Sequence, residues 1–488
     1  MAGRTLKTNF MINVAGAIVP IAVSLVTVPI YVRHIGDARY GVLSIVWVLL
    51  GYFGFLDLGL SRAATNALAR LRNAAQEERA RVLVTTLALN LMLGLFGGLC
   101  LGIFGSYLLQ HVLAVPDELK PEIARAFPWI VGLFPLALVS GVGIGALESR
   151  ERFALCNVLQ VSGAAFGQIV PVVLAVTVSP SLDVVIPAAA MARALTVVAI
   201  LIAVYRGEHP LPLTAFDRRQ AAKLVSYGGW ISLSGIISPV LNSLDQFVIG
   251  SSLSVASVTY YAVPMNLVTR SQIFAGALVR TLFPRLSRVS ADEAQLLATR
   301  ALLVLAHGYA AICAPAIILT PVFFKYWISA DFAAVAAPVA QILFFGAWIN
   351  GLAFVPFGML QGQGRPDITG KLHAAEVLPY VCVLWTLTST YGISGAALAW
   401  SLRCAVDAAC LFWAAALPRR SIFLALAPLP LLLACPSISH LTSADILPAL
   451  CAAGIVTGLS LGISIAIVPE LKGVHGLWKI AFRHNVAS

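Results

Sequence analysis

Four arginines interrupt stretches of the chain that are otherwise apolar: Arg193, Arg270, Arg280 and Arg403. A guanidinium group stays charged, and its planar fork donates paired hydrogen bonds to phosphate. Facing lipid at the centre of a bilayer would cost each of them at least about 2.5 kcal/mol. We therefore expect these side chains to face a cavity or a partner, and they are candidates for binding an anionic head group.

The neighbours of these arginines distinguish them. Arg193 and Arg270 have no acidic residue within one helical turn, and Asn266 lies four residues before Arg270, on the same helical face. Asp407 follows Arg403 at the i, i+4 spacing, so local neutralisation and substrate binding are both open for that arginine. Arg280 lies nearer to the end of its apolar stretch, where a long side chain can extend to the interface.

Acidic residues in apolar stretches indicate a second kind of chemistry. Asp245 shares a polar helical face with Asn242 and with two serines one and two turns further back. Asp245 and Asn242 are candidates for coupling transport to a cation or a proton, and pairing with an arginine from another helix is the alternative. Glu376 and His373 could join either arrangement.

Asp57 and Arg62 close an apolar stretch that begins near Gly41. They are five residues apart, too far around a helix for an ideal ion pair. Both lie toward the predicted cytoplasmic end of their span. A contact with a neighbouring helix, or a role at an inner gate, is therefore favoured over substrate contact.

The composition indicates which elements must position these residues. Hydrophobic residues make up 59% of the 488 residues and charged residues 11%, far from the quarter that soluble proteins approach. Continuous apolar stretches that approach or exceed the roughly 20 residues needed to cross a membrane recur along the chain. The predicted spans are 10–32, 41–62, 83–108, 127–148, 157–178, 184–205, 226–250, 256–284, 299–322, 334–360, 373–390, 393–416, 422–440 and 446–468. The sequence predicts an all-α polytopic membrane protein with about 14 transmembrane helices.

Basic residues predict the orientation. Lys and Arg are concentrated in every second loop, which places those loops and both termini in the cytoplasm. The net charge of +11 is then mainly a signal of topology, so we predict no nucleic-acid partner. The sequence has no Walker A glycine loop, no Cys-x-x-Cys and no His-x-x-x-His pair, so we expect no ATP hydrolysis and no metal site.

An internal repeat predicts the domain organisation. Five small or polar positions between Asn13 and Thr27 recur with the same spacing between Ser232 and Gln246. The pattern Gly-x-Leu-[Glu/Gln]-x-x-x-Arg that begins at Gly145 recurs from Gly358. The repeat predicts two lobes of six helices in parallel orientation, a geometry that suits alternating access. The predicted domains are residues 1–215, residues 216–418, and a C-terminal helix pair with a tail at 421–488.

Several segments carry a family resemblance. Residues 28–41 read VPIYVRHIGDARYG, residues 51–62 read GYFGFLDLGLSR, and residues 391–397 read YGISGAA. With the repeated Gly-x-Leu motif, these segments resemble the Wzx-type polysaccharide flippases of the multidrug/oligosaccharidyl-lipid/polysaccharide (MOP) exporter superfamily. The resemblance covers about residues 8–416.

The resemblance implies a V-shaped transporter of two six-helix bundles in the bacterial inner membrane. It implies translocation of an undecaprenyl-pyrophosphate-linked oligosaccharide, the repeat unit of a surface polysaccharide such as the O-antigen, with no catalytic residue. The implied partners are this lipid-linked oligosaccharide and membrane lipids, with a polysaccharide polymerase and glycosyltransferases as further candidates. No cofactor is expected, and coupling to a Na⁺ or H⁺ gradient is a candidate energy source.

Other functions compete with this one. A lipid II flippase would share the fold and the pyrophosphate chemistry. A multidrug/cation antiporter of the same superfamily would prefer an acidic cavity, whereas the charges predicted at mid-span here are mostly basic. A membrane-embedded polymerase or ligase would be an enzyme and usually has a large outer loop, whereas the loops predicted here are short.

Overall fold

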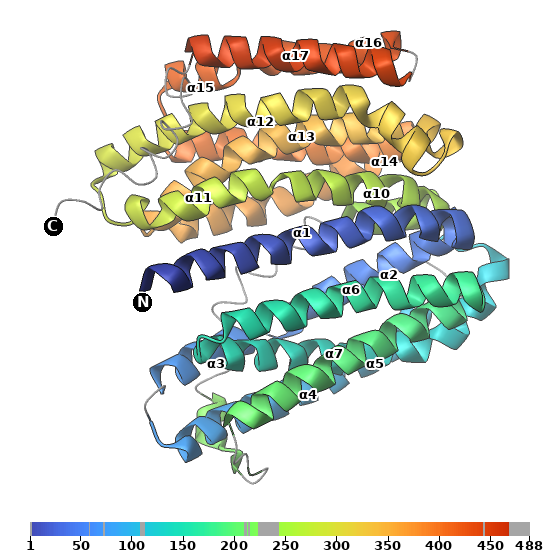
Figure 1. Cartoon of the computed structure of the whole chain (residues 1–488), viewed down its shortest axis with the longest axis vertical. Coiled ribbons are helices and arrows are strands. Elements are labelled where there is room, and N and C mark those ends of the chain that lie inside the picture. Colours follow the sequence, from blue (N-terminus) through green and yellow to red (C-terminus); the bar gives the residue numbers. More distant parts are fainter. Residues whose placement is uncertain are drawn as a thin grey trace. The chain divides into compact units, whose positions relative to one another are not determined.

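The computed structural model describes residues 2–57, 59–71, 74–107, 113–208, 212, 215–222, 244–442 and 445–467. Within helices, the side chains of residues 2–18, 49–56, 62, 66, 106, 281 and 284 are outside this description. The described residues form helices and connecting turns, and no strand occurs among them (Figure 1).

The chain divides by its internal contacts into two units, Met1–Thr259 and Tyr260–Ser488. The helices of the first unit are α1 (Ala2–Ile35), α2 (Asp37–Leu56), α3 (Leu60–Arg70), α4 (Gln76–Tyr107), α5 (Lys120–Ser149), α6 (Phe153–Thr177), α7 (Leu182–Glu208), α9 (Leu244–Ser252) and the first turn of α10 (Val255–Ser271). Within it, α5 packs against α4 and α7, and α1 lies along α6 (Figure 1). The predicted lobe boundary at residues 215/216 stays a prediction, because residues 223–243 are outside the described part.

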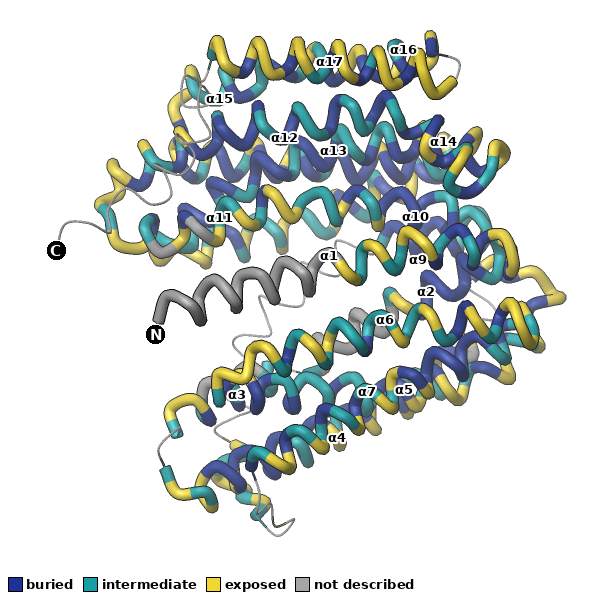
Figure 2. The backbone as a smooth tube through the Cα atoms, in the orientation of Figure 1, coloured by how far each residue is buried: buried dark blue, intermediate teal, exposed yellow. Residues whose placement is uncertain are grey.

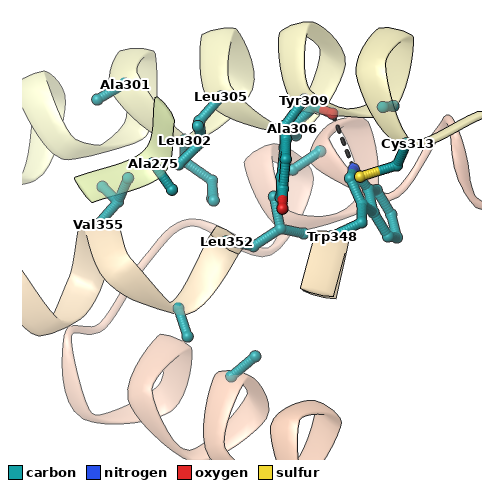
Figure 3. Close-up of a cluster of buried hydrophobic side chains, with 14 of the residues drawn as sticks. Ala275, Ala301, Leu302, Leu305, Ala306, Tyr309, Cys313, Trp348, Leu352 and Val355 are labelled. Atoms are coloured by element: carbon teal, nitrogen blue, oxygen red, sulfur yellow. Dashed lines mark hydrogen bonds between the residues drawn. The ribbon is translucent and has the colours of Figure 1, made fainter. Parts of the chain in front are cut away.

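The second unit contains the rest of α10 and seven further helices. These are α11 (Ile273–Leu286), α12 (Ala291–Trp327), α13 (Ala330–Gly362), α14 (Pro366–Ala414), α15 (Arg419–Ala425), α16 (Leu429–Leu441) and α17 (Ile446–Ile467). The core between α12 and α13 is built on small residues, which let the helices approach closely. The buried indole of Trp348 donates a 2.9 Å hydrogen bond to the carbonyl of Ala306 in this core (Figure 3).

Nine of the helices in the described residues are long and apolar enough to cross a membrane. Their outer faces carry many exposed apolar side chains, such as Phe104 on α4, Leu195 on α7 and Ile455 on α17. Exposed positions recur along these helices (Figure 2). In water such surfaces would be a liability, whereas lipid solvates them. The prediction of an all-α polytopic membrane protein is confirmed.

The predicted spans 41–62 and 256–284 are each divided into two helices. The span 41–62 breaks between α2 and α3, where Gly59 adopts a φ of 67° that favours glycine. The span 256–284 breaks at Gln272, between α10 and α11. Hydropathy does not change across either break. Each apolar stretch was therefore predicted as one span.

The repeated glycines lie beside these breaks. A Cβ on Gly145 of α5 would come within 2.2 Å of the Thr65 hydroxyl on α3. A Cβ on Gly358 of α13 would come within 2.4 Å of the Val279 side chain on α11. In each unit, the repeated motif therefore lets a long helix approach the helix that follows a break.

α14 contains two predicted spans, 373–390 and 393–416. Gly392 separates them with a φ of 60° and a ψ of −143°, so the helix is two arms joined at a sharp turn. A Cβ on Gly395 would come within 1.9 Å of the Leu387 carbonyl oxygen, so glycine is required for the arms to meet. The segment YGISGAA of the family resemblance forms this turn.

The C-terminal helices α15, α16 and α17 pack on α12. One anchor is His307 of α12, which is fully buried and within hydrogen-bond distance of two residues. Its Nδ1 lies 3.1 Å from the Ser464 hydroxyl of α17, and its Nε2 lies 3.1 Å from the Leu424 carbonyl of α15. The predicted span 422–440 is two helices, α15 and α16, in keeping with its prolines.

Candidate functional site

Arg270 lies in the last turn of α10, directly before the break at Gln272. Its side chain is half-buried, and Asn266, one turn earlier, is exposed. The break is held from the other side by Tyr309 of α12, whose hydroxyl lies 2.6 Å from that of Ser271. Arg270 and Asn266 are therefore presented together beside a helix interruption, as their spacing predicts.

The start of α11 adds positive potential at the same place. No side chain caps this helix, and the side-chain nitrogen Nε2 of Gln272 is buried and makes no hydrogen bond among the described residues. The first backbone N–H groups of a helix attract anions. Arg280 is exposed on α11, and its Nη2 lies 3.9 Å from where a Cβ on Gly276 would stand, so its guanidinium folds back toward the break. We call Asn266, Arg270, Gln272 and Arg280 the α10–α11 site.

Arg193 lies near the middle of α7 and is exposed. The exposed apolar side chains of α7, including Met191, Leu195 and Val198, lie on the opposite face of the helix. Val197, one turn after Arg193, is buried. Arg193 therefore does not belong to the broad apolar face that lipid would cover.

Asp245 lies in the first turn of α9 and is fully buried. Its Oδ1 accepts the backbone N–H of Gln246 at 2.8 Å. Asn242 lies outside the described residues, so the ion site predicted from this pair stays a prediction.

Asp57 lies at the break between α2 and α3. Its carboxylate accepts the backbone N–H of Ser61 at 3.0 Å and the Ser61 hydroxyl at 2.8 Å, which satisfies a free donor in the first turn of α3. The side chain of Arg62 is outside the described residues. The structure therefore gives Asp57 a local contact at the break and leaves the predicted gate untested.

Arg403 faces the other arm of α14. One of its terminal nitrogens lies 3.9 Å from Glu376 Oε2, and its guanidinium lies 5.4 Å from the centroid of the Tyr380 ring. The Arg403 and Glu376 side chains are 10% and 9% exposed. The partner of Arg403 is thus an acid from the first arm, in addition to Asp407 one turn away on its own arm.

His373 and Asp407 extend this contact by a second acid–base pair. His373 Nε2 lies 3.6 Å from Asp407 Oδ1, and the His373 ring stacks on Phe357 of α13 at 5.7 Å. The Asp407 carboxyl is also a close electrostatic neighbour of Glu376. We call His373, Glu376, Tyr380, Arg403 and Asp407 the α14 cluster. The sequence marked Arg403 together with Asp407, and Glu376 together with His373. It missed Tyr380, whose i, i+4 spacing from Glu376 was the available signal.

A third group of charges lies at one end of the first unit. Glu208, at the end of α7, accepts two hydrogen bonds from Arg79 at 2.5 and 3.0 Å and two from Arg150 at 2.9 Å. Gln76 donates a further bond at 3.1 Å, and Arg79 also reaches the Leu68 carbonyl. Hydrogen bonding to Glu208 raises the pKa of Arg150 above its ordinary value. This Arg79 cluster joins α3, α4, α5 and α7.

A fourth group joins other helix ends of the same unit. Arg39 of α2 donates two hydrogen bonds to Glu122 of α5, at 2.9 and 2.6 Å. The backbone N–H of Leu182, at the start of α7, donates to the same carboxylate at 2.9 Å. Sequence analysis missed the Arg39 and Arg79 clusters, because their members are far apart along the chain.

These groups differ in what they can do chemically. In the Arg39 and Arg79 clusters, each carboxylate is paired with arginine and accepts several hydrogen bonds, which favours a structural role. The α10–α11 site presents two arginines at a helix start, which suits an anion. Among the described residues, no group of His, Cys, Asp or Glu is arranged to hold a metal ion.

Comparison with known sequences gives two matches. Residues 6–290 match the family described as polysaccharide biosynthesis protein. A protein of Shigella flexneri named "Putative O-antigen transporter" is 27% identical over 412 residues, which cover 83% of this chain and 96% of that protein.

Comparison with solved structures shows the same fold. The lipid II flippase MurJ, in an inward closed conformation, has a TM-score of 0.76 at 11% identity, over 94% of this chain and 99% of MurJ. An inward-facing multidrug resistance MATE family transporter of the MOP superfamily has a TM-score of 0.68 at 16% identity, over 84% of this chain and 99% of its own. At these identities the likeness concerns the fold alone.

Proposed function

Because the chain belongs to the polysaccharide biosynthesis protein family, we propose that it is a flippase for a lipid-linked polysaccharide repeat unit. The name of its relative from Shigella flexneri supports an O-antigen-type substrate. We propose undecaprenyl pyrophosphate as the lipid carrier, the bacterial inner membrane as the location, and cytoplasmic termini. Alternating access moves the head group while the lipid tail remains in the bilayer, without a chemical reaction.

The α10–α11 site is the observation that carries this proposal. A pyrophosphate needs cationic donors inside the membrane, and a broken transmembrane helix supplies them at low cost because its free N–H groups already point into the break. Arg270 precedes the break and Arg280 folds toward it. Two guanidinium groups and a helix start can together hold the two phosphates.

Other residues complete the proposal. Arg193 is a further candidate for contact with the head group, because its face of α7 is not the apolar one. Arg403 is a further candidate, held by the α14 cluster. An H⁺ or Na⁺ gradient would drive the transport cycle, with Asp245 and Asn242 as candidate coupling residues. Glycosyltransferases and a polysaccharide polymerase would act on the repeat unit before or after its translocation.

A lipid II flippase is the second candidate, supported by the fold shared with MurJ. The two substrates have the pyrophosphate in common, so the α10–α11 site suits both. The family match and the relative from Shigella flexneri favour the polysaccharide repeat unit. A cation antiporter is disfavoured by the positive charge at this site.

The test is complementation of a bacterial strain whose own O-antigen flippase has been deleted. The unchanged chain is expected to restore surface O-antigen, seen as a ladder of lipopolysaccharide bands. Arg270→Gln should reduce the ladder at least tenfold, and Arg193→Gln and Arg280→Gln should each reduce it, because each removes a charged phosphate donor. Membrane abundance is measured in parallel on the same samples.

Arg288→Gln is the matched control, because Arg288 is exposed just after the end of α11 and away from the break. It should leave the ladder unchanged. Failure of the unchanged chain to restore the ladder would contradict the proposed substrate, and restoration of growth to a strain depleted of its lipid II flippase would favour the second candidate. Full activity of the Arg270 and Arg193 variants would exclude the anion site.

A further inference from the structure

The α14 cluster contains a buried carboxylate without hydrogen bonds. The Glu376 side chain is 9% exposed, and neither of its oxygens has a hydrogen-bond partner among the described residues. Its nearest positive charge, on Arg403, is 3.9 Å away, beyond hydrogen-bond distance. An ionised carboxylate is costly to bury in this way, whereas a protonated carboxyl is neutral. A further positive charge near Glu376 would therefore stabilise its buried carboxylate.

The formal charges of the α14 cluster show how much positive charge is missing around Glu376. Glu376 and Asp407 would carry two negative charges against one positive charge on Arg403. His373 faces Asp407 at 3.6 Å, and in its neutral form adds no charge. From α13, the ring of Phe357 faces His373 and carries no charge. Tyr380 and Cys404 also face Arg403 and are neutral when protonated. One added proton would bring the net charge of the cluster to zero.

The two carboxyl groups lie at the same level of α14. Glu376 and Asp407 are nearly equal numbers of residues before and after the turn at Gly392, about 23 Å from it at 1.5 Å per residue. The charged electrostatic neighbours of Glu376 among the described residues are Asp407 and Arg403. The thiols of Cys404 and Cys410 also interact with it, and all four residues belong to the second arm. A proton can therefore be shared between the two carboxyls across the interface of the arms.

We propose that Glu376 and Asp407 together bind one exchangeable proton, and that this pair is the proton-coupling site of the transport cycle. The proposal rests on the proposed function for its coupling role, but not for proton binding itself. A hydronium ion of the surrounding water gives its proton to a carboxylate oxygen and leaves as water, and the cluster changes from one net negative charge to none. Release requires the arms to admit water, because the ionised pair is uncompensated when they are closed.

A metal cation fits this site less well than a proton. The guanidinium of Arg403 and the ring of His373 already occupy the near sides of Glu376 and Asp407. No group of metal-ligating side chains is assembled here or elsewhere in the described residues. A proton needs neither a cavity nor a coordination shell, so the packing of the arms does not oppose it.

The experiment is an infrared pH titration of the full-length protein in lipid nanodiscs, without any glycolipid. The unchanged protein should show a titrating band of a buried protonated carboxyl group that shifts in deuterated water. Glu376→Gln and Asp407→Asn, which keep the shape of each side chain, should each remove this band. Glu148→Gln, at an exposed acid in the last turn of α5, is the matched control and should retain it.

The outcomes separate this proposal from the proposed function. A band that persists in both variants, or that is lost in Asp245→Asn instead, would overturn the assignment whether or not the protein is a flippase. Displacement of the band by sodium chloride but not potassium chloride would assign a sodium site and also overturn it. If the band behaves as expected, both variants should lose the dependence of O-antigen export on the pH gradient, and unchanged dependence would contradict the coupling role.

Discussion

The Arg79 cluster and the α14 cluster are both buried groups of acids and bases, yet they are built in opposite ways. Glu208 accepts hydrogen bonds from Arg79, Arg150 and Gln76, and its side chain is 3% exposed. Glu376 is nearly as buried, at 9% exposed, and accepts none among the described residues. The first cluster ties helix ends together, whereas the second lies within the two arms of one helix.

The two clusters show that burial alone does not decide the role of a carboxylate, because their hydrogen bonds differ. A buried carboxylate with saturated hydrogen bonds is fixed in its ionised form, so it can only hold helices in place. A buried carboxylate without hydrogen bonds has no such constraint and can gain or lose a proton at small cost in contacts. Glu122 is intermediate, since it accepts three hydrogen bonds but its partner Arg39 is 30% exposed. The loss of stability on Glu→Gln substitution can therefore be compared between Glu208, Glu122 and Glu376.

The largest effect is expected for Glu208→Gln. The neutral amide leaves the charge of Arg79, which is 1% exposed, without its buried counter-ion. Removing one partner of a buried ion pair costs about 3–5 kcal/mol. The thermal unfolding midpoint of the purified protein should fall by several degrees, and membrane abundance should fall with it. A midpoint within one degree of the unchanged protein, a difference of about 1 kcal/mol or less for a chain of this length, would show that this cluster is not structural.

An intermediate effect is expected for Glu122→Gln. Its ion pair with Arg39 is partly open to solvent, which screens the charge, so the loss is about 1 kcal/mol. The loss should shrink in high salt, unlike that of Glu208→Gln, because buried pairs are screened less. The midpoint measured in low and high salt checks this. Equal salt dependence of the two variants would remove the distinction between the clusters.

The smallest effect is expected for Glu376→Gln. The amide replaces a carboxyl group that makes no hydrogen bond, so the stability should change by less than about 1 kcal/mol, in either direction. The midpoint in the same assay checks this, with Glu148→Gln as the control for loss of an exposed acid. A loss as large as that of Glu208→Gln would mean that Glu376 is a structural ion pair, and the comparison between the clusters would fail.

The sequence predicted the parts of the site that depend on neighbours along the chain. The shared face of Asn266 and Arg270 follows from helical spacing, and the structure presents both beside the break. The turn at Gly392 falls between the predicted spans 373–390 and 393–416. The repeated motif at Gly145 and Gly358 was found from the sequence. That these glycines lie close to α3 and α11 did not follow from the repeat alone.

Other features could not be predicted in this way. Arg79 and Glu208 are 129 residues apart, and nothing in either local sequence selects the other. The breaks at Gly59 and Gln272 leave the apolar pattern unchanged, so span prediction did not find them. For Arg403, helical spacing pointed to Asp407 on its own arm, and the contact with Glu376 required the two arms of α14 to be placed side by side.

The sequence by itself determined that lipid is the solvent and that helices span it, and it marked charged residues within the spans as candidates for a function. The physical reason is that transfer of side chains into a membrane depends on composition and spacing, which are local properties. Tertiary structure alone decided which charge faces which, because hydrogen bonds and ion pairs act over a few ångströms between helices that the chain connects only at a distance. The same acidic residue type is therefore a structural anchor at Glu208 and an open carboxyl group at Glu376.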